Sequence, residues 1–350
     1  MTLHTIPELD RNLPQTIQYV TRQLTTLSCH VFQPTEGAVC AYFDFGKEKA
    51  LAFRADMDAL PIQEETALPY SSRHPGCMHA CGHDGHTAIL LSLARKINET
   101  KTFPHNALLI FQPAEETGGG AEDICKTGIL EQYGVTAIFG LHLWPGLPQG
   151  QIFSRPGVLM ATACGVNVRF FGKSVHIAQA HQGTDALAAC CEFYHQTVEI
   201  QQTAPYLLKF GKITGGTAPN IVCGQAELSG SLRAWDETVL EKAKMEIRLL
   251  CQQAEEKTDC IGQVSFSSGY PAVYNDPKLW EQVCSVVPVR ELSQPVMTTE
   301  DFSFYQEKIP GIFFLLGVGN TAPLHSPRFS FDPKILSHGT NLFFRLLHDF

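Results

Sequence analysis

The sequence has no apolar run long enough to cross a membrane, and it carries little charge for its length. Its most apolar stretch, GIFFLLGVG from Gly311, has the length of a strand, whereas a membrane span needs about 20 apolar residues. Charged residues make up 17% of the 350, the formal net charge is −9, and no run of Lys or Arg offsets it. Nucleic acids and anionic membranes favour basic patches, so we expect neither as a partner.

The sequence also lacks a signal-like N-terminus and a regular cysteine pattern. The segment MTLHTIPELDRNLPQT is polar and is interrupted by Pro7 and Pro14, so we expect no secretory signal. The 12 cysteines are scattered without a repeating spacing. We therefore interpret them as buried or ligating thiols in a reducing compartment, and we expect a cytoplasmic protein.

Short apolar runs alternate with helical patterns over the first 160 residues. The pattern predicts strands in VCAYFDF from Val39, ALAFRADMD from Ala50, ALLIFQPAEE from Ala107 and AIFGLHLW from Ala137. It predicts a helix in HTAILLSLARKINE from His86. Strands that alternate with helices indicate an α/β fold with a central sheet flanked by helices.

The pattern changes near residue 160. Residues 161–270 read strand, helix, strand, strand, helix, strand, which predicts an α+β unit with a four-stranded antiparallel sheet and two helices. After it, TTEDFSFYQEKI, GIFFLLGVG and ILSHGTNLFFRLLHDF return to the first pattern. We therefore expect a discontinuous catalytic domain, 1–160 and 271–350, with an inserted domain at 161–270.

The segment HACGHDGH, from His79 to His86, gathers one thiol, three imidazoles and a carboxylate. Cys81 and His83 lie two positions apart and can reach one ion from a loop that enters a helix. Thiolate and imidazole favour zinc, manganese, cobalt or nickel over magnesium or calcium. The alternative is a plain helix N-terminus with Asp84 and His86 on a solvated face.

The segment QPAEETGGG follows the apolar run ALLIF, at the point where a strand is expected to end. Active sites of open α/β sheets lie beyond such ends. Two adjacent carboxylates can divide their tasks there, with one binding a metal and the other acting as a base. The alternative is a solvated acidic loop.

Two further histidines are candidate metal ligands, although neither would indicate a metal site by itself. His142 lies in GLHLW after the apolar run AIF, and His325 lies in LHSP near the C-terminus. Either could be a packed or surface histidine. Together with the two stronger segments, they supply enough ligand-type side chains for a binuclear site.

These segments resemble the metallo-aminoacylase and carboxypeptidase family of two-metal amidohydrolases. The resemblance is greatest to the branch that contains hippurate hydrolase, auxin-conjugate hydrolases and N-acetyl-diaminopimelate deacetylase. It runs from LHTIPEL through FRADMDALPI to the final helix and covers nearly the whole chain. HACGHD combined with PAEE is highly specific, whereas LHSP alone would mean little.

The resemblance implies a catalytic domain with two divalent ions (Mn, Zn, Co or Ni) and an inserted lid domain that pairs subunits into a homodimer or homotetramer. It implies that Glu115 is the general base and acid, and that Asp56 orients a ligand. The implied metal ligands, with the sulfur between the two ions, are Cys81, His83, Glu116, His142 and His325.

The resemblance also extends into the inserted domain. His176 matches a family histidine that stabilises the oxyanion, often from the partner subunit. Asn220, Arg233 and His181 match substrate-binding positions, with Arg233 suited to a carboxylate. The family usually has a proline before the second of the two histidines, and Ala180 stands there, which puts the role of His181 in doubt.

The implied activity is hydrolysis of the amide bond of an N-acyl amino acid by a metal-activated water, with Glu115 as the base. A dipeptidase or carboxypeptidase would use the same groups with a different pocket, and an N-acetyl-diaminopimelate deacetylase is a narrower form of the main hypothesis. A non-catalytic ligand sensor and a structural zinc site are the alternatives outside catalysis. Retention of both Glu115 and Glu116 argues against the sensor, and the wide spacing of the ligands argues against the zinc site.

Overall fold

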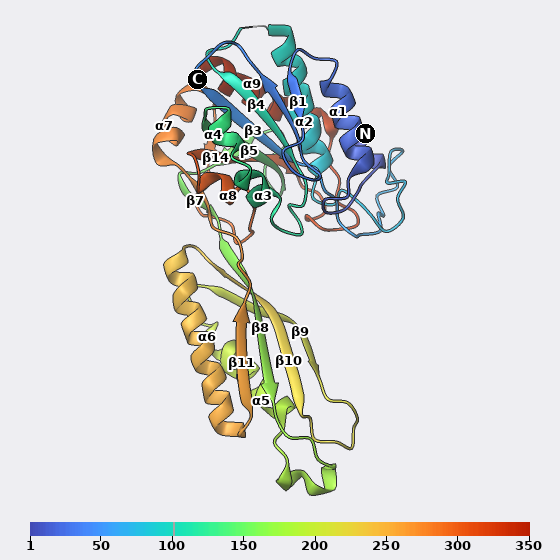
Figure 1. Cartoon of the computed structure of the whole chain (residues 1–350), viewed down its shortest axis with the longest axis vertical. Coiled ribbons are helices and arrows are strands. Elements are labelled where there is room, and N and C mark those ends of the chain that lie inside the picture. Colours follow the sequence, from blue (N-terminus) through green and yellow to red (C-terminus); the bar gives the residue numbers. More distant parts are fainter. Residues whose placement is uncertain (101) are drawn as a thin grey trace. The chain divides into compact units, whose positions relative to one another are not determined.

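The structure is a computed structural model that describes residues 1–100 and 102–350. The chain divides into two compact units (Figure 1). Unit 1 comprises Met1–Leu159, Val273–Pro295 and Glu300–Phe350, and unit 2 comprises Met160–Ala272 and Val296–Thr299. The segment Val296–Thr299 belongs to unit 2 because Ala161 N donates to Thr298 O at 3.0 Å and Met160 forms a β-bridge with Val296.

Within the described residues, unit 1 contains an eight-stranded mixed sheet. The two strands at one edge are antiparallel to their neighbours, whereas β4, β3, β5 and β14 are mutually parallel. The order across the sheet is β1 (His30–Phe32), β2 (Val39–Phe43), β4 (Asn106–Gln112), β3 (Ala50–Asp56), β5 (Val135–Pro145), β14 (Gly311–Gly319), β6 (Ile152–Ser154) and β13 (Arg290–Glu291).

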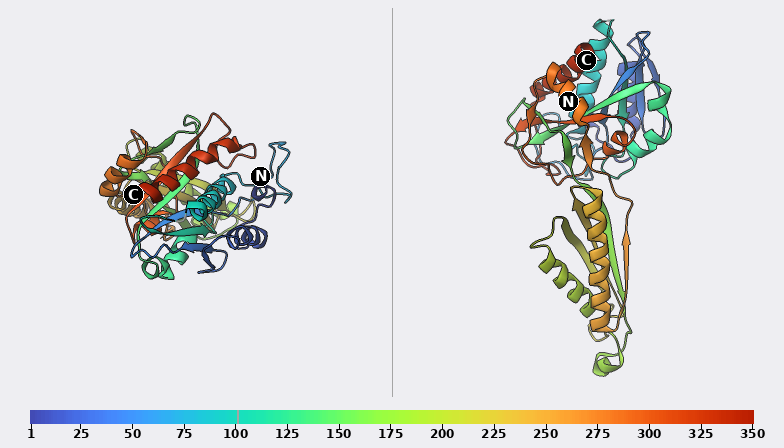
Figure 2. Two further views of the ribbon diagram at one scale, coloured as in Figure 1. Left: turned by 90° about the horizontal axis from the view of Figure 1, so that it is seen from above. Right: turned by 90° about the vertical axis from the view of Figure 1, so that its left-hand side faces the viewer.

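Helices cover both faces of this sheet (Figure 1, Figure 2). Every residue of β3 and β4 is buried, as expected for parallel strands with helices on both sides. The helical segments of unit 1 are η1 (Leu3–Thr5), α1 (Pro14–Leu24), α2 (His83–Thr100), α3 (Gly120–Lys126), α4 (Ile129–Gln132), α7 (Pro277–Val286), α8 (Ser303–Gln306), η3 (Pro333–Ile335) and α9 (Leu336–Asp349). The short strands β7 (Gly157–Met160) and β12 (Val273–Asn275) pair with each other.

The core of unit 1 lies between the sheet and the helices α1, α2, α7 and α9. Phe53 on β3 is central, because its ring lies 5.6 Å from that of Phe139 and 5.2 Å from that of Phe343. Alternate residues of β3 point to the opposite face, where Arg54 contacts polar groups instead. β3 therefore buries apolar side chains on one face of the sheet and charged side chains on the other.

Unit 2 has the predicted four-stranded antiparallel sheet and two long helices. The order is β11 (Ile261–Phe266), β8 (Thr162–Phe171), β10 (Gln225–Ala234) and β9 (Leu207–Gly215), and the helical segments are η2 (Ile177–Gln182), α5 (Ala186–Ile200) and α6 (Glu237–Thr258). Asp185 caps α5 and Asp236 caps α6 through their side chains. The predicted fold class, a mixed α/β sheet together with a separate α+β element, is confirmed.

The parallel strands of unit 1 run in the same direction, and polar residues lie at their C-terminal ends. Asp56 at the end of β3 is in register with Gln112 at the end of β4, and His142 lies near the end of β5. No helix in the described residues is long and apolar enough to cross a membrane.

Candidate active site

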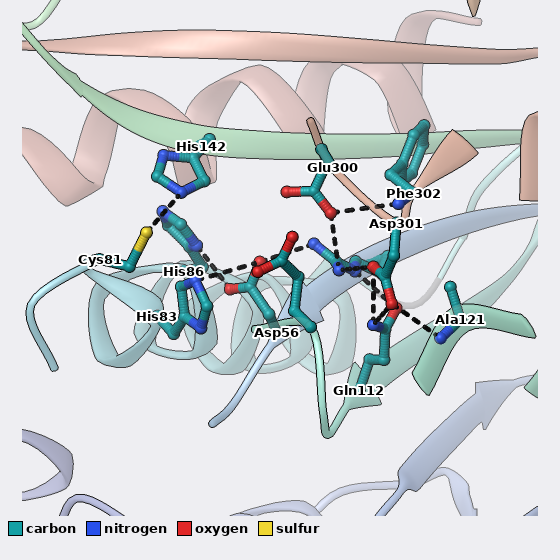
Figure 3. Close-up of polar contacts among 12 residues, drawn as sticks. Asp56, Cys81, His83, His86, Gln112, Ala121, His142, Glu300, Asp301 and Phe302 are labelled. Carbon is teal, nitrogen blue, oxygen red and sulfur yellow. Dashed lines mark hydrogen bonds and ion pairs between the residues drawn. The ribbon is translucent and has the colours of Figure 1, made fainter. Parts of the chain in front are cut away.

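The candidate catalytic and ligand side chains of unit 1 converge at the C-terminal ends of these parallel strands (Figure 3). Asp56 and His142 come from β3 and β5, and Glu115 and Glu116 come from the loop after β4. Cys81 precedes α2 and His83 is its first residue. Gly82 between them has φ +84°, a conformation that glycine adopts at little cost, so the loop can turn both side chains toward the site.

The five predicted metal ligands lie together. The Cys81 Sγ is 3.3 Å from His142 Nε2 and 3.4 Å from His325 Nε2. The Glu116 Oε1 is 3.2 Å from His325 Nε2 and 3.9 Å from His83 Nε2. Cys81 therefore belongs to two overlapping sets of donor atoms, one with His83 and His142 and the other with Glu116 and His325, each set within 4.8 Å.

The electrostatics of this cluster fit a cation site. The Cys81 thiol is buried beside Glu116 and Glu115, and burial followed by these charges raises its pKa well above the usual value. His83 Nε2 is buried and has no hydrogen-bond partner among the described residues. A thiol, imidazoles and a carboxylate facing one another are a donor set for zinc, manganese, cobalt or nickel.

Glu115 lies beside these donors. One of its carboxylate oxygens is within 4.8 Å of donor atoms of His83 and Glu116, and it also lies near Glu300 and Asp301. Burial, followed by the charges of Glu300 and Glu116, raises the pKa of Glu115 well above its usual value. A carboxyl group held in this environment has a strong tendency to accept a proton.

Asp58 fixes the loop that carries the two glutamates. Its carboxylate accepts the backbone N–H of Glu115 at 3.2 Å and that of Glu116 at 3.1 Å. Its backbone carbonyl accepts from His83 Nδ1 at 2.9 Å, which leaves Nε2 of that ring facing the cluster. Asp58 thus orients three of the side chains described above.

Asp56 links the cluster to the sheet. Its Oδ1 accepts from His86 Nδ1 at 2.6 Å, and its Oδ2 lies 3.8 Å from His83 Nε2. His86 Nε2 in turn accepts the backbone N–H of Leu143, which follows His142. Burial alone would raise the pKa of Asp56, but the charges of His83, His86 and Arg54 outweigh it and hold the pKa well below its usual value.

The alternative in which Asp84 and His86 occupy a solvated helix face is wrong, because both side chains are buried. Asp84 accepts from His4 Nδ1 at 3.0 Å, and His4 Nε2 lies 3.3 Å from Glu64. Polar residues at a helix N-terminus are usually expected to be exposed. Here Asp84 and His86 bond to residues that lie 80 and 30 positions away in the sequence. The first turn of α2 is consequently part of the interior.

Behind the site, Arg54 connects Asp56 to buried residues that the sequence did not reveal. Its Nη1 donates to Asp56 at 2.6 Å, and its Nη2 lies 2.6 Å from Asp301 and 2.9 Å from Glu300. Its Nε donates to Gln112 at 2.8 Å. Burial, only partly offset by Arg54, raises the pKa of Glu300 to about 8. The one available sequence signal was the acidic pair in TTEDFSFY, which precedes an apolar segment.

The remaining predicted site residues lie in unit 2. His176 is exposed, and its Nδ1 accepts the backbone N–H of Ala178 at 3.2 Å. Asn220 is exposed and its carbonyl accepts from Ile177 N at 3.0 Å, so it lies next to His176. His181 is exposed, with Gln182 as its neighbour. Arg233 is half-buried on β10 and donates to Met297 O at 2.5 Å.

Comparison with known proteins identifies the family. The sequence profile of peptidase family M20/M25/M40 matches residues 52–349. The chain belongs to this family. As a family member it is a hydrolase that acts on amide bonds, which confirms the predicted enzyme class.

Relatives in this family agree over almost the full length of the chain. An uncharacterized hydrolase of Staphylococcus haemolyticus is 35% identical, with 99% of this chain and 95% of the relative covered. An N-acetyldiaminopimelate deacetylase of Exiguobacterium sibiricum is 37% identical over 84% of this chain and 82% of its own. A solved Bacillus subtilis structure, described as a dinuclear metal-binding peptidase of the M20 family, has a TM-score of 0.86 and 29% identity over 99% of this chain and 94% of that one.

Proposed function

We propose that this family member hydrolyses the amide bond of an N-acyl amino acid, with Glu115 as the general base. The observation that carries the proposal is the convergence of Cys81, His83, Glu116, His142 and His325, with the Glu115 carboxyl group beside them. The relative named as an N-acetyldiaminopimelate deacetylase supports deacylation of an amino acid nitrogen.

We assign two divalent ions to the five converging residues, which would hold them through one thiol, three imidazoles and one carboxylate. The Bacillus subtilis relative described as a dinuclear metal-binding peptidase supports this assignment. When bound, two such ions polarise the amide carbonyl and increase the acidity of a water molecule. Asp56 and Asp58 keep the surrounding imidazoles oriented through the hydrogen bonds to His86 and His83.

Glu115 carries the proton in this mechanism. It takes a proton from the attacking water as the C–O bond forms, and it gives that proton to the amide nitrogen as the C–N bond breaks. The products are a carboxylic acid and an amine, which together contain all the atoms of the amide and the water. The acid then passes its proton to the amine or to the solvent. The raised pKa of Glu115 in its buried position suits a group that must both accept and release a proton.

His176 is proposed to stabilise the oxyanion of the tetrahedral intermediate. Because its Nδ1 accepts a hydrogen bond from Ala178 N, the neutral ring carries its proton on Nε2. That N–H can donate to the substrate carbonyl oxygen, and such a donor has a large effect in acyl transfer. The exposure of His176 on unit 2 leaves the ring accessible to a substrate or to a partner subunit.

Arg233, Asn220 and His181 are proposed to bind the substrate. Arg233 uses one of its five N–H donors on Met297 O, and the others remain to bind a substrate carboxylate as a fork. Asn220 lies beside His176 through the hydrogen bond between Ile177 N and its own carbonyl. His181 has the least support, since Ala180 replaces the usual proline.

We further propose that unit 2 forms a homodimer. β9 is an edge strand of its sheet, and exposed apolar side chains lie on it and on the neighbouring helix α5. Ile213 is 52% exposed, Tyr194 45% and Val198 42%. The rings of Tyr194 and Phe210 are 6.5 Å apart, which joins the helix and the strand in one apolar face.

The experiment that tests the activity is a substrate panel with defined metals. The full chain is loaded with manganese, zinc, cobalt or nickel and supplied with N-acetyl amino acids including N-acetyl-diaminopimelate, N-benzoyl amino acids and dipeptides. We expect release of an amino acid from an N-acyl substrate. Preference for dipeptides would replace the proposal by a dipeptidase, and turnover of no substrate with any metal would favour a ligand sensor.

The variant Glu115→Gln separates the base from the ligands. It should bind the same amount of metal as the wild type, measured by elemental analysis, and lose turnover by at least about 100-fold. Glu131→Gln, which removes an exposed carboxylate on α4, should leave both unchanged. Normal turnover by Glu115→Gln would refute the assignment of the base.

A further inference from the structure

A cavity in unit 1 is lined by none of the residues of the candidate active site. It has a volume of about 400 Å³, which is within the usual range for small-molecule sites. It is formed by the turn before β6, by the segment from Val287 to Arg290 and by α9. Its lining includes Gln151, Ile152, Val287 and Arg290.

One face of α9 supplies the polar wall of this cavity. His338, Asn341, Leu342 and Arg345 follow a spacing of three and four residues, which places them along one side of the helix. Leu342 is buried, while His338 and Arg345 are exposed. The helix therefore presents polar side chains, including the cation Arg345, above an apolar base.

The charge of the cavity is opposite to that of the chain. The sequence carries a net charge of −9, yet the lining holds Arg290 and Arg345 and no acidic residue. Within the described residues, Arg290 makes no ion pair. Arg345 pairs with Asp349 at 3.2 Å on the surface, and such an exposed pair can readily be exchanged for a ligand carboxylate.

The floor of the cavity combines apolar surface with one unsatisfied acceptor. Ile152, Val287 and Leu342 are apolar and are wholly or partly buried. Gln151 Oε1 is buried and has no hydrogen-bond partner among the described residues. A buried acceptor without a donor is costly, so the Gln151 side chain would gain a partner by turning its amide oxygen toward the cavity and accepting from the O–H or N–H group of a ligand.

We propose that this cavity binds a small organic carboxylate that has an apolar body and an O–H or N–H donor. The two arginines match the carboxylate, the apolar floor matches the body, and Gln151 Oε1 matches the donor. The proposal does not depend on which amide the enzyme cleaves.

The register of the sheet connects this cavity to the candidate active site. Phe153, which follows the lining residue Ile152 on β6, pairs with Leu315 on β14, and Leu315 pairs with His142 on β5. The cavity wall is thus two strands from a proposed metal ligand, so occupancy can be tested for an effect on turnover once binding has been established.

The test uses isothermal titration of the full chain with 4-hydroxyphenylacetate, which has a carboxylate, an aromatic body and a hydroxyl group. Phenylacetate lacks the hydroxyl donor, and 4-hydroxyphenylethanol lacks the charge. We expect saturable binding of 4-hydroxyphenylacetate and weaker binding of both analogues. In the double variant Arg290→Gln/Arg345→Gln we expect binding to weaken about tenfold or more, the cost of a lost charge-assisted hydrogen bond.

Two further variants keep the result unambiguous. Arg95→Gln removes an exposed arginine outside the cavity and should bind like the wild type. Gln151→Met should lose the preference for 4-hydroxyphenylacetate over phenylacetate while it still binds both. Absence of saturable binding by the wild type, or equal affinity in the double arginine variant with an unchanged melting temperature, would overturn the proposal. Because binding is measured directly, failure here is separate from failure of the proposed amidohydrolase activity.

Discussion

Among single residues, Asp58 offers a direct test of how the glutamate loop is held. Asp58→Asn replaces one acceptor oxygen by an NH₂ group. The side chain can then accept the backbone N–H of Glu115 or of Glu116 but not both, because each oxygen of Asp58 accepts one of them. We expect activity to fall about 10–100-fold, as for other residues that orient ligands. The control Asp44→Asn changes an exposed carboxylate that accepts from Gly46 N. Full activity in Asp58→Asn would show that the loop is held by other contacts.

Arg54 is predicted to dominate the stability of unit 1. Its guanidinium is buried and contacts Asp56, Glu300 and Asp301. Arg54→Met would leave these carboxylates without a counter-charge, so we expect the free energy of unfolding to fall by about 3–5 kcal/mol. Urea denaturation measures this, and Arg54→Lys should lose less because it keeps the charge. A loss below about 1 kcal/mol would show that the carboxylates are protonated instead.

The residues that sequence reasoning found and those it missed differ in kind. Cys81, His83 and Glu116 stand in dense motifs whose side chains have few roles other than ligation. Arg54 and Asp301 are ordinary charged residues 247 positions apart, and nothing local indicates that they form a buried pair. Whether two such residues meet depends on the order of the strands in the sheet and on the face to which each side chain points. A single sequence does not contain that information.

At the scale of elements, the turn into α3 depends on Gly120. A Cβ built there would lie 1.8 Å from the carbonyl oxygen of Pro113, in the loop that carries Glu115. Gly120→Ala should therefore displace this loop, destabilise the chain by about 1–3 kcal/mol and reduce turnover. Gly211→Ala is the control, because its Cβ would meet no atom within 4 Å. Equal melting temperatures and rates for the two variants would contradict the prediction.

Strands and long helices were predicted closely because their patterns are strong. β3 begins at Ala50 and β5 includes the predicted run from Ala137. α2 begins at His83, three residues before the apolar periodicity starts at His86, because its first turn buries polar side chains that pair with distant residues. Where the buried side chains of a helix end are polar, as in the first turn of α2, apolar periodicity does not reveal that end.

At the scale of the whole molecule, stability should depend on pH through His4. Burial alone would lower the pKa of His4, but its hydrogen bond to Asp84 and the charges of Asp84 and Glu64 outweigh it and raise the pKa from 6.5 to about 9. The stabilisation is therefore complete below pH 6.5 and is lost as the pH rises through about 9.

The measurement compares the urea unfolding free energy of the wild type with that of His4→Gln below pH 6.5 and above pH 9. The difference between the two proteins should shrink as the pH rises. His30→Gln changes an exposed histidine and should show no such trend. A difference that stays constant over this range would exclude the ionic contribution of His4.

Assembly is the second test at this scale. If α5 and β9 form the dimer surface, Val198→Asp combined with Ile213→Asp should give monomers in light scattering where the wild type gives dimers. Met245→Asp, at a 67% exposed position on α6, is the control. Dimers that persist in the double variant would locate the interface elsewhere.

The place of β14 in the sheet has a consequence for biosynthesis. This strand is made near the end of translation, yet it lies between β5 and β6. Glu300 and Asp301, two acidic partners of Arg54, precede it by about ten residues. A ribosome-bound chain that has emerged up to unit 2 therefore holds a half-sheet with an open apolar edge and an interior arginine that has only Asp56 of its three acidic partners. Unit 2 can complete its own sheet at that stage, so the inserted segment should be protease-resistant on the ribosome before the segments on either side of it are.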